Sequence, residues 1–530
     1  MHLKRFTVAF FFVFMLFAFS ACAADVLTES TPIPPPPNAD NDVGSDEVAV
    51  STLEPSPLPE DTAVQPTPTL FPSATPTAEA PPTAVADSAT QAEPLPATSR
   101  DLLFLADGAF KQWNHATSQI ETIVAGATST NPTPDNPDKP TIGSITAYAM
   151  NADGKRAVVA RVTNSTNAPD VQNAPAEYGY ELLFVDMISR EVWTLVPQVD
   201  NLQGFELSPD AQQLAFIGSG LNGNPDAVSN EPIPTNLYVM ETGGGNPANL
   251  RTVHRCQRLC SSPEWHIENN LMVFGDDDAL WLYNIAAAEP ERLFDNNPFN
   301  SDMTDVGEVS VYWPETWARN GRTLMLWHGG WEWGSRALYD LPTGVLLEIP
   351  NSLIFADIFP TQVSWMPDDR ILVWRTDFSE EAFIPLVALW RFDVGSGELI
   401  LEETAQLSHE NLGVMGGIHL EDGRFAFALD AAPLGSEAEQ LQAPQGIYQL
   451  TSLAEQPERV NSLPPNEGGS RQVTVLWAAD GSGALLLQSD RPTQPLLYYA
   501  PADSNILYEV TAVFGQNPRA FQWQPEIILP

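Results

Sequence analysis

The sequence predicts an all-β protein, an eight-bladed β-propeller that follows a non-globular N-terminal segment. Three observations predict this fold. A short sequence pattern recurs at similar intervals between residues 150 and 523. Each interval holds four runs of strand-forming residues, which is the content of one propeller blade. No apolar pattern with a period of 3.6 residues is sustained after Arg100, which excludes a helical solenoid.

The recurring pattern consists of an anchor residue, a turn rich in Asp, Asn and Gly, and then a run of aliphatic residues. Segments 150–154 (MNADG) and 477–481 (WAADG) show it clearly. The anchors are Met150, Leu207, Trp265, Trp317, Trp365, His419, Trp477 and Trp523, spaced 46 to 58 residues apart. An internal period of this length is typical of propellers and other repeat folds.

A second pattern follows each of the first seven anchors. It is a β-rich stretch, a turn rich in Gly, Asp or Ser, and another β-rich stretch. Segments 237–240 (LYVM) before 243–245 (GGG) and 389–393 (LWRFD) before 395–397 (GSG) are examples. Together the two patterns give four short strands per repeat, which predicts one blade for each.

The two ends of the repeat region complete one blade between them. Residues 102–105 (LLFL) form an aliphatic strand that no anchor precedes, and Trp523 is an anchor that no further strands follow. We therefore expect 521–523 to be the inner strand of a blade whose other strands lie in 102–124. Such closure leaves no free sheet edge at the seam. The count is then eight blades, with seven as the alternative if the weakest repeat, at His419, is a loop.

Composition excludes some classes of function. The chain has 530 residues, with 24 Lys and Arg against 68 Asp and Glu, a formal net charge of −44. A surface this acidic repels phosphate backbones, so we exclude nucleic acid as a partner. Hydrophobic residues make up 43% of the chain, which is enough for a core. The 3 Cys residues exclude a scaffold built on disulfides.

The first 22 residues have the pattern of an export signal. A short basic segment precedes an apolar run over 6–19. The segment 19–22 (FSAC) resembles the bacterial lipobox, in which Leu usually stands in the place of Phe19. This resemblance implies that Cys22 is acylated and anchors the protein to the cell membrane on its extracytoplasmic face. An uncleaved signal anchor is one alternative, since 6–24 is long enough to span a bilayer, and plain secretion is another.

Residues 23–100 are predicted to form a disordered linker that acts as a stalk. They are rich in Pro, Ala, Ser and Thr, with a run of four prolines at 34–37. Proline fixes φ and removes hydrogen-bond donors, and the segment has few large apolar residues to make it collapse. At about 3 Å per residue its contour reaches roughly 200 Å. The remaining region, 101–530, is the predicted propeller.

Two segments resemble the repeats of TolB-like (WD-type) propellers. They are 207–210 (LSPD) and 237–247 (LYVMETGGGNP), and the family has a Trp-Ser-Pro-Asp-Gly turn before one strand and a Tyr-Val-Met-Asp strand before a Gly-rich turn. The chain departs from this pattern at 265–267. The resemblance implies a propeller in an extracytoplasmic setting. Some TolB-like propellers are lyases with a metal held by His at the central axis. His419 is the one candidate here to face that channel, and a buried structural His is the alternative.

Successive turns of a blade emerge alternately on the two faces of the disc. The first and third turns of each repeat are short, and we name their side the plain face. The second turns and the links between blades share the other side, which we name the loop face. Its long segments are 126–142, 163–178, 219–235, 295–307, 328–335, 377–385 and 430–444. Loops on a rigid scaffold usually carry binding surfaces, so we expect recognition there, with tolerated insertion as the alternative.

The most unusual of these loops is 328–334 (HGGWEWG). An exposed Trp beside Gly suits stacking on a sugar ring or on an apolar side chain. We therefore take His328, Trp331 and Trp333 as a candidate binding loop. The alternative is packing in the blade core, which we expect for Trp317.

Cys256 and Cys260 lie four residues apart in the link between the third and fourth blades. After export this pair is expected to form a disulfide. Free thiols are one alternative, and a metal site with His254 or His266 is another, although zinc-ligand spacing is absent. The acidic run 276–278 lacks the spacing of a calcium loop, so we expect a solvated turn and no metal.

No catalytic signature is present in the sequence: it has no Gly-x-Ser-x-Gly elbow, no His-Glu-x-x-His pair and no phosphate-binding loop. We therefore expect no catalytic residue and no cofactor. The sequence predicts a monomeric, lipid-anchored propeller that recognises or scaffolds a protein or glycan ligand at the cell envelope. The alternative is a propeller enzyme, a polysaccharide lyase or hydrolase with its site at the central channel. A structural surface protein is a third possibility.

Overall fold

A computed structural model describes residues 90–91, 95–127, 140–166, 177–221, 235–256, 260–268, 270–299, 306–330, 333–354, 359–378, 382–408, 411–431, 444–464, 473–488 and 496–525. The regular elements in these ranges are strands, apart from two single 3₁₀ turns, η1 (Val306–Glu308) and η2 (Thr511–Val513). Within them, no helix has the length and apolar character needed to cross a membrane.

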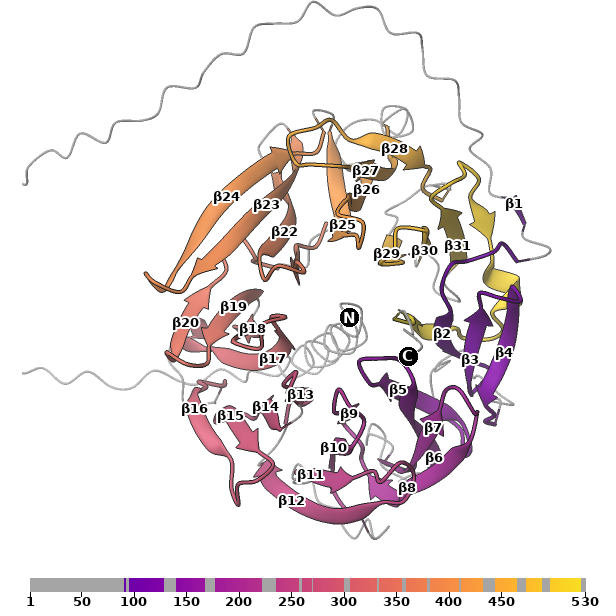
Figure 1. Ribbon diagram of the computed structural model, residues 1–530, viewed down its shortest axis with the longest axis vertical. Coiled ribbons are helices and arrows are strands. Elements are labelled where there is room, and N and C mark those ends of the chain that lie inside the picture. Colours follow the sequence, from indigo (N-terminus) through magenta and orange to yellow (C-terminus); the bar gives the residue numbers. More distant parts are fainter. Residues whose placement is uncertain are drawn as a thin grey trace, which may run out of the picture. The chain divides into compact units, whose positions relative to one another are not determined.

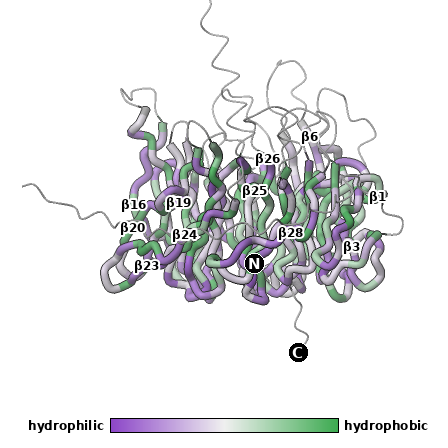
Figure 2. The backbone as a smooth tube through the Cα atoms, turned by 90° about the horizontal axis from the view of Figure 1, so that it is seen from above, coloured by the Kyte–Doolittle hydropathy of each residue, from purple (hydrophilic) through white to green (hydrophobic). Residues whose placement is uncertain are grey.

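The strands form eight sheets of four antiparallel strands, and one sheet gains a fifth strand. The sheets follow one another around a ring (Figure 1). Seen edge-on, the strands run between the two faces of a disc (Figure 2). The chain is therefore an eight-bladed β-propeller, and the predicted fold is confirmed. We number the blades from 1 to 8 in chain order.

Each blade places its four strands in the same order from the axis of the ring to its rim. The inner strands are β33 (Arg519–Trp523), β5 (Ile145–Met150), β9 (Gly204–Leu207), β13 (Glu264–Trp265), β17 (Val311–Trp317), β21 (Gln362–Trp365), β25 (Leu412–His419) and β29 (Val473–Trp477). The second strands are β2 (Leu102–Ala106), β6 (Arg156–Thr166), β10 (Gln213–Gly218), β14 (Leu271–Gly275), β18 (Thr323–Gly329), β22 (Ile371–Phe378), β26 (Phe425–Ala431) and β30 (Gly483–Gln488).

The outer half of each blade completes this order. The third strands are β3 (Ala109–Asn114), β7 (Glu177–Asp186), β11 (Thr235–Glu241), β15 (Ala279–Asn284), β19 (Gly334–Asp340), β23 (Phe383–Asp393), β27 (Gly446–Leu450) and β31 (Leu496–Pro501). The rim strands are β4 (Gln119–Val124), β8 (Val192–Asp200), β12 (Ala248–Cys256), β16 (Glu291–Asp295), β20 (Val345–Glu348), β24 (Glu398–Gln406), β28 (Glu458–Asn461) and β32 (Tyr508–Glu509).

Blade 1 closes the ring by combining both ends of the propeller. Leu102 of β2 pairs with Trp523 of β33, and Leu103 pairs with Gln522. Phe521 and Trp523 are buried in an apolar cluster to which blade 8 also contributes. The predicted closure by the terminal strands is confirmed.

The folded part begins before the predicted linker boundary at residue 100. β1 (Thr90–Gln91) pairs in parallel with β32 and adds a fifth strand at the rim of blade 8. Leu95 packs against the closing cluster of blade 1. The Arg100 guanidinium lies 2.5 Å from the Glu421 carboxylate and 3.3 Å from that of Asp480. The last part of the predicted linker therefore binds to the propeller through one short strand and one Arg, features too small to produce a sequence pattern.

Three of the anchor residues join their blade to the one before it by a hydrogen bond. In blades 4, 6 and 1 the indole N–H of the anchor Trp donates to a backbone oxygen just before the anchor of the preceding blade. These bonds run from Trp265 to Glu206 at 3.2 Å, from Trp365 to Thr316 at 3.3 Å and from Trp523 to Leu476 at 3.0 Å. A Trp at this position buries a large apolar ring, which explains why the residue recurs there. In these three blades the indole N–H is also satisfied, whereas the buried N–H of Trp317, the anchor of blade 5, has no hydrogen-bond partner among the described residues.

His419 occupies the anchor position of blade 7, at the end of β25. Its ring lies edge-on to Phe425, with the centroids 5.0 Å apart. Burial lowers the pKa of His419, although the negative charge of Asp368 opposes this effect. Because β25 to β28 form a complete sheet around it, the repeat at His419 is a blade and the count of eight holds.

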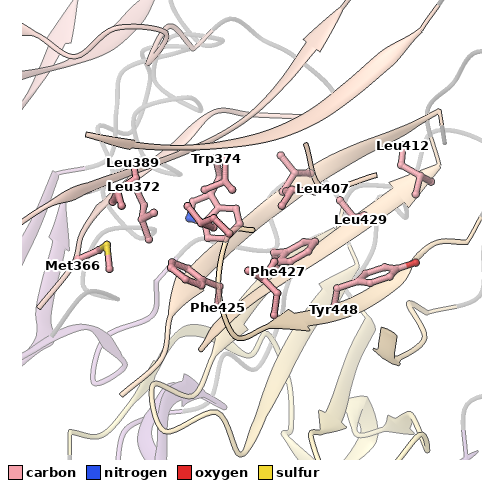
Figure 3. Packing of buried hydrophobic residues seen from close by; sticks show 14 residues of the cluster. Met366, Leu372, Trp374, Leu389, Leu407, Leu412, Phe425, Phe427, Leu429 and Tyr448 are labelled. Atoms are coloured by element: carbon pink, nitrogen blue, oxygen red, sulfur yellow. The ribbon is translucent and has the colours of Figure 1, made fainter. Parts of the chain in front are cut away.

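The core lies between neighbouring blades. In the cluster shared by blades 6 and 7, Trp374 of β22 packs among Phe425, Phe427 and Tyr448 (Figure 3). Trp374 is fully buried, and its ring centroid lies 5.6 Å from that of Phe427. Gly417 gives the indole the room it needs, since a Cβ there would lie 2.7 Å from the ring.

The two faces of the disc differ in how uniform their connections are. The first turn, on the plain face, has five residues in each of blades 2 to 8; the turn from Met150 to Arg156 is one example. The second connection, on the loop face, ranges from two residues, between Ala106 and Ala109, to sixteen, between Gly218 and Thr235. The chain therefore repeats one design on the plain face and varies it on the loop face.

Hydrogen bonds between adjacent blades run along the plain face. They join first turns that are neighbours in the ring, through side chains or backbone groups. The bonds are Gln524 Nε2 to Gly154 O, Asn151 Nδ2 to Pro209 O, His266 Nε2 to Gly321 O, Asn320 N to Asp369 Oδ1 and Glu421 N to Ala479 O, at 2.7 to 3.2 Å. These contacts use the polar groups of the turns for internal bonds, so the plain face acts as the structural side of the disc.

A buried ion pair supports the third turn of blade 5. The Asp340 side chain is 1% exposed, and its two oxygens accept from Arg322 Nε at 2.5 Å and Nη2 at 2.8 Å. Burial alone would raise the pKa of Asp340, but the hydrogen bonds from Arg322 and Thr343 outweigh it and hold that pKa below its ordinary value. A carboxyl group of this kind stabilises the fold above its unfolded-state pKa of about 4, and the contribution is lost as the pH falls through the folded-state pKa.

We expect Asp340→Asn to lower the melting temperature by a few degrees at pH 7, because the Arg322 guanidinium loses its charged acceptor. The difference from the unmodified protein should stay constant between pH 8 and about pH 5 and shrink below about pH 4. Thermal unfolding across this pH range measures it. Asp503→Asn, at an exposed position, is the matched control and should change little. A difference that grows as the pH falls would contradict the assignment.

Candidate functional site

The residues predicted to carry function fall in different places. Cys22 and Trp331 lie outside the described residues, as do large parts of the long loop-face segments. Cys256 and Cys260 form a disulfide at the end of β12, with their Cα atoms 5.7 Å apart. Both half-cystines are buried beside Trp265 in the cluster between blades 3 and 4. The disulfide therefore ties the end of β12 to the residues just before β13, the first strand of blade 4.

His328 is a buried strand residue rather than part of an open loop. It is the second-last residue of β18 and is 7% exposed. In the ladder it pairs with Tyr312 on one side and with Ser335 on the other. This differs from the expectation that the 328–334 segment presents His328 to a ligand. The reason is that β18 extends through Gly329 and takes His328 into the sheet.

His328 is the centre of a polar cluster that crosses all four strands of blade 5. We name Ser310, Tyr312, His328, Ser335 and Glu348 the blade-5 polar cluster. The Ser310 Oγ lies 2.9 Å from His328 Nε2, and a carboxylate oxygen of Glu348 lies 2.7 Å from His328 Nδ1. Nδ1 also lies 3.4 Å from the Ser335 Oγ, so Glu348 is its nearer partner, and Ser310 is the partner of Nε2.

Glu348 receives further hydrogen bonds from the cluster. The Tyr312 hydroxyl lies 3.2 Å from Oε1, and Ser335 Oγ donates to Oε2 at 3.0 Å. Partial burial would raise the pKa of Glu348, but the hydrogen bond and charge of His328, together with these hydroxyls, hold it below its ordinary value. Glu348 is therefore ionised at neutral pH. Because a carboxylate only accepts, it fixes the proton of a neutral His328 on Nδ1 and leaves Nε2 to accept from Ser310.

Two aromatic rings hold the imidazole in place. The Tyr312 ring stacks on His328 with the centroids 4.1 Å apart and an angle of 7° between the planes. Trp333 meets the same imidazole edge-on at 4.8 Å. Trp333, one of the residues predicted for binding, is half-buried and packs on His328. The ring of His328 is thereby fixed in both position and orientation.

Glycines shape the loop-face end of blade 5. A Cβ added at Gly329 would lie 1.9 Å from the Trp327 indole, and one at Gly330 would lie 2.3 Å from the Trp333 indole. Trp327 in turn stacks on Trp313, with the centroids 5.5 Å apart. The Gly-Gly pair read from the sequence as a mark of exposure thus makes room for packed tryptophans.

Replacing Gly329 by Ala is expected to destabilise the protein by about 1–3 kcal/mol, the usual range for overpacking, because the indole of Trp327 must move away. The near-UV circular dichroism of the stacked tryptophans should change as well. Gly395→Ala is the matched control, since the nearest atom to a Cβ there is 3.7 Å away. Equal melting temperatures for the two variants would show that the Trp327 contact is not tight.

The acidic turn next to the disulfide differs from the predicted solvated turn. Asp276 is 5% exposed, accepts from the backbone N–H groups of Asp278 and Ala279, and lies 2.7 Å from Nε2 of His254. Burial would raise the pKa of Asp276, but the hydrogen bond of His254, the nearby Trp281 side chain and the Ala279 N–H together hold that pKa below its ordinary value. Among the described residues, no group of three or more His, Cys, Asp or Glu side chains is placed to hold a metal ion.

The sequence did not predict a role for four residues of the cluster, Ser310, Tyr312, Ser335 and Glu348. Ser310 belongs to the long link between β16 and β17, and the other three lie on three different strands, so no sequence spacing connects them. The available signal was the position of His328 inside an aliphatic strand, where a polar residue requires partners. A correct strand register would then have placed Tyr312 and Ser335 beside it.

No protein-family profile and no curated protein matches the chain. Among solved structures it is similar to the β-propeller domain of the trilobed protease from Pyrococcus furiosus, at 12% sequence identity and a TM-score of 0.34, over 67% of this chain and 92% of that one. It is also similar to an oligogalacturonate lyase in complex with manganese, at 11% identity and a TM-score of 0.37, over 77% and 84% of the two chains. TolB from Acinetobacter baumannii has 12% identity and a TM-score of 0.29, over 70% and 83%. These likenesses concern the propeller fold alone.

Proposed function

We propose that the protein is an exported, lipid-anchored propeller that binds a protein or glycan ligand through its loop face. In this proposal it acts as a monomer at the extracytoplasmic side of the cell membrane, with residues 23–89 as the stalk. Binding by this face requires no cofactor. Nucleic acid is not among its ligands, because the net charge is −44.

The observation that carries the proposal is the difference between the two faces. Seven first turns on the plain face have one length, and hydrogen bonds join the first turns of blades 1 and 2, 2 and 3, 4 and 5, 5 and 6, and 7 and 8. Connections on the loop face differ in length from blade to blade. A scaffold that keeps one side constant and varies the other has the form of a recognition module, since variable loops on rigid strands supply specific contacts.

Two further features support export. The basic segment, the apolar run and Cys22 form the pattern of a lipoprotein signal. The Cys256–Cys260 disulfide is of a kind that persists in oxidising compartments and is rare in reducing ones. Together they favour an extracytoplasmic position for the propeller.

Metabolic labelling with a fatty-acid analogue tests the anchor. The unmodified chain should incorporate the label and remain with the membrane fraction, whereas Cys22→Ala should lose the label and leave the membrane. Persistent membrane association of the unlabelled variant would favour an uncleaved signal anchor.

Blocking one face at a time tests the binding surface. Phe378, at the end of β22 on the loop face, is 64% exposed, and Ile188, in the third turn of blade 2 on the plain face, is 58% exposed. The full chain with Phe378→Cys or Ile188→Cys is coupled to a maleimide polymer and applied to a glycan array and to immobilised envelope proteins. The polymer at position 378 should abolish the binding seen with the uncoupled protein, and the polymer at position 188 should leave it intact. The opposite pattern would place recognition on the plain face.

A further inference from the structure

We propose that Ser310, His328 and Glu348 form a nucleophilic site that transfers acyl groups from carboxylic esters, with Ser310 as nucleophile, His328 as general base and Glu348 as the residue that orients the imidazole. The Ser310 Oγ lies 2.9 Å from His328 Nε2, and His328 Nδ1 lies 2.7 Å from a Glu348 oxygen. Activated serine nucleophiles require these two hydrogen bonds in this order.

The site is assembled before any substrate arrives. The backbone of Ser310 is bonded to Asn297 in both directions, with its N–H donating at 2.9 Å and its oxygen accepting at 2.7 Å. The imidazole is held between Tyr312 and Trp333, and the Glu348 carboxylate receives hydroxyl groups from Tyr312 and Ser335. All three reacting groups thus have fixed supports, which nucleophilic catalysis requires.

The nucleophile is also within reach of solvent. Ser310 is half-buried and stands just before β17, at the end of the strand that opens on the loop face. His328 is buried behind it, with 9% of its side chain exposed. An acyl group can therefore approach Ser310 while the base stays shielded from bulk water.

The reaction that this geometry supports is the hydrolysis of an ester in two steps. The Ser310 Oγ forms a bond to the carbonyl carbon as its proton moves to His328 Nε2. The bond to the alcohol oxygen then breaks, and that oxygen takes the proton from Nε2. In the second step a water molecule gives a proton to Nε2 and attacks the acyl group, the bond to Ser310 Oγ breaks, and Oγ regains the proton. Ester and water thus yield an acid and an alcohol.

Turnover is expected to be slow. The Ser310 N–H is already bonded to Asn297, so it does not serve a developing oxyanion, and each such donor typically contributes about 10²–10³ in rate. Covalent capture of the nucleophile is therefore a better readout than hydrolysis. The half-buried Trp333 beside the imidazole favours an ester with an apolar or aromatic group.

The test uses a fluorophosphonate probe, which forms a covalent bond with activated serines. The full chain is treated with the probe in detergent, and the modified peptide is identified by mass spectrometry. We expect labelling at Ser310, no labelling there in Ser310→Ala, and a rate at least about 100-fold lower in His328→Gln, the usual contribution of a general base. Glu348→Gln should lower the rate as well and move its pH dependence.

Ser396→Ala is the matched control, since Ser396 is an exposed turn serine on the plain face and its loss should leave the labelling unchanged. Near-UV circular dichroism verifies the fold of each variant. Should a variant misfold, the pH profile of labelling of the unmodified chain still decides, because an activated serine requires a rise with the titration of one base. Absence of labelling at Ser310 in the unmodified chain, or a flat pH profile, would overturn the proposal. Ligand binding by the loop face is measured separately, so either proposal can fail without the other.

Discussion

Replacing Trp374 by Ala is expected to lower the free energy of unfolding by about 4 kcal/mol, the middle of the usual range for a buried Trp. Trp374 is fully buried, and it fills the space between blades 6 and 7 together with Phe425 and Phe427 (Figure 3). Its loss leaves a cavity that the surrounding strands cannot close, because both sheets are fixed by their own ladders and by neighbouring blades. Guanidinium unfolding followed by tryptophan fluorescence measures the change.

Trp374→Phe separates the cavity from the indole itself. This variant keeps most of the apolar volume and should cost much less than Trp374→Ala. Phe378→Ala, four residues along the same strand and 64% exposed, should change the free energy of unfolding by no more than about 0.5 kcal/mol. Similar losses in all three variants would mean that the cluster between blades 6 and 7 does not govern stability.

The fold was predictable because each blade repeats a local pattern with a local cause. The anchor Trp recurs since its indole is buried between two blades, and in Trp265 and Trp365 its N–H also donates to the backbone of the preceding blade. The five-residue turn after it recurs since the same two strands must be joined each time. Periodic constraints of this kind remain visible in a single sequence.

The candidate site was not predictable in the same way. Ser310 and Glu348 meet His328 only because the four strands of blade 5 take one particular register. Register depends on contacts between strands, and a shift by one residue turns every side chain to the other face. The His-Gly-Gly-Trp segment was therefore interpreted as an exposed loop, when its first residues continue a strand and its glycines accommodate packed indoles.

The position of the blade-5 polar cluster fits the division between the two faces. It lies at the loop-face ends of its strands, next to the link from blade 4, and the disulfide at Cys256 fastens the preceding link on the same face. The plain face uses its polar groups for bonds between blades. Among the described residues, the loop face therefore holds both the variable connections and the blade-5 polar cluster.

Closing the ring depends on the last strand, and we expect the double variant Phe521→Ala and Trp523→Ala to lose about 6 kcal/mol or more of unfolding free energy. Both side chains are 6% exposed and belong to the cluster that joins blade 1 to blade 8. Trp523 also donates its indole N–H to Leu476 at 3.0 Å, so its loss also removes a hydrogen bond between these blades. A loss of this size is comparable to the whole stability of a typical domain, so much of the protein should be open or unfolded.

Limited proteolysis locates the opening. Cleavage should begin in blade 1, where β2 loses the strand that covers its inner edge, and spread to blade 8. A matched pair of substitutions at the exposed apolar residues Ile188 and Phe378 should leave the cleavage pattern unchanged. If the double variant instead unfolds like the unmodified chain, the terminal strand does not stabilise the ring. The contacts of Arg100 with Glu421 and Asp480 would then hold blade 1 to its neighbours. Arg100→Ala, combined with the double variant, then distinguishes a ring held by one seam contact from a ring held by two.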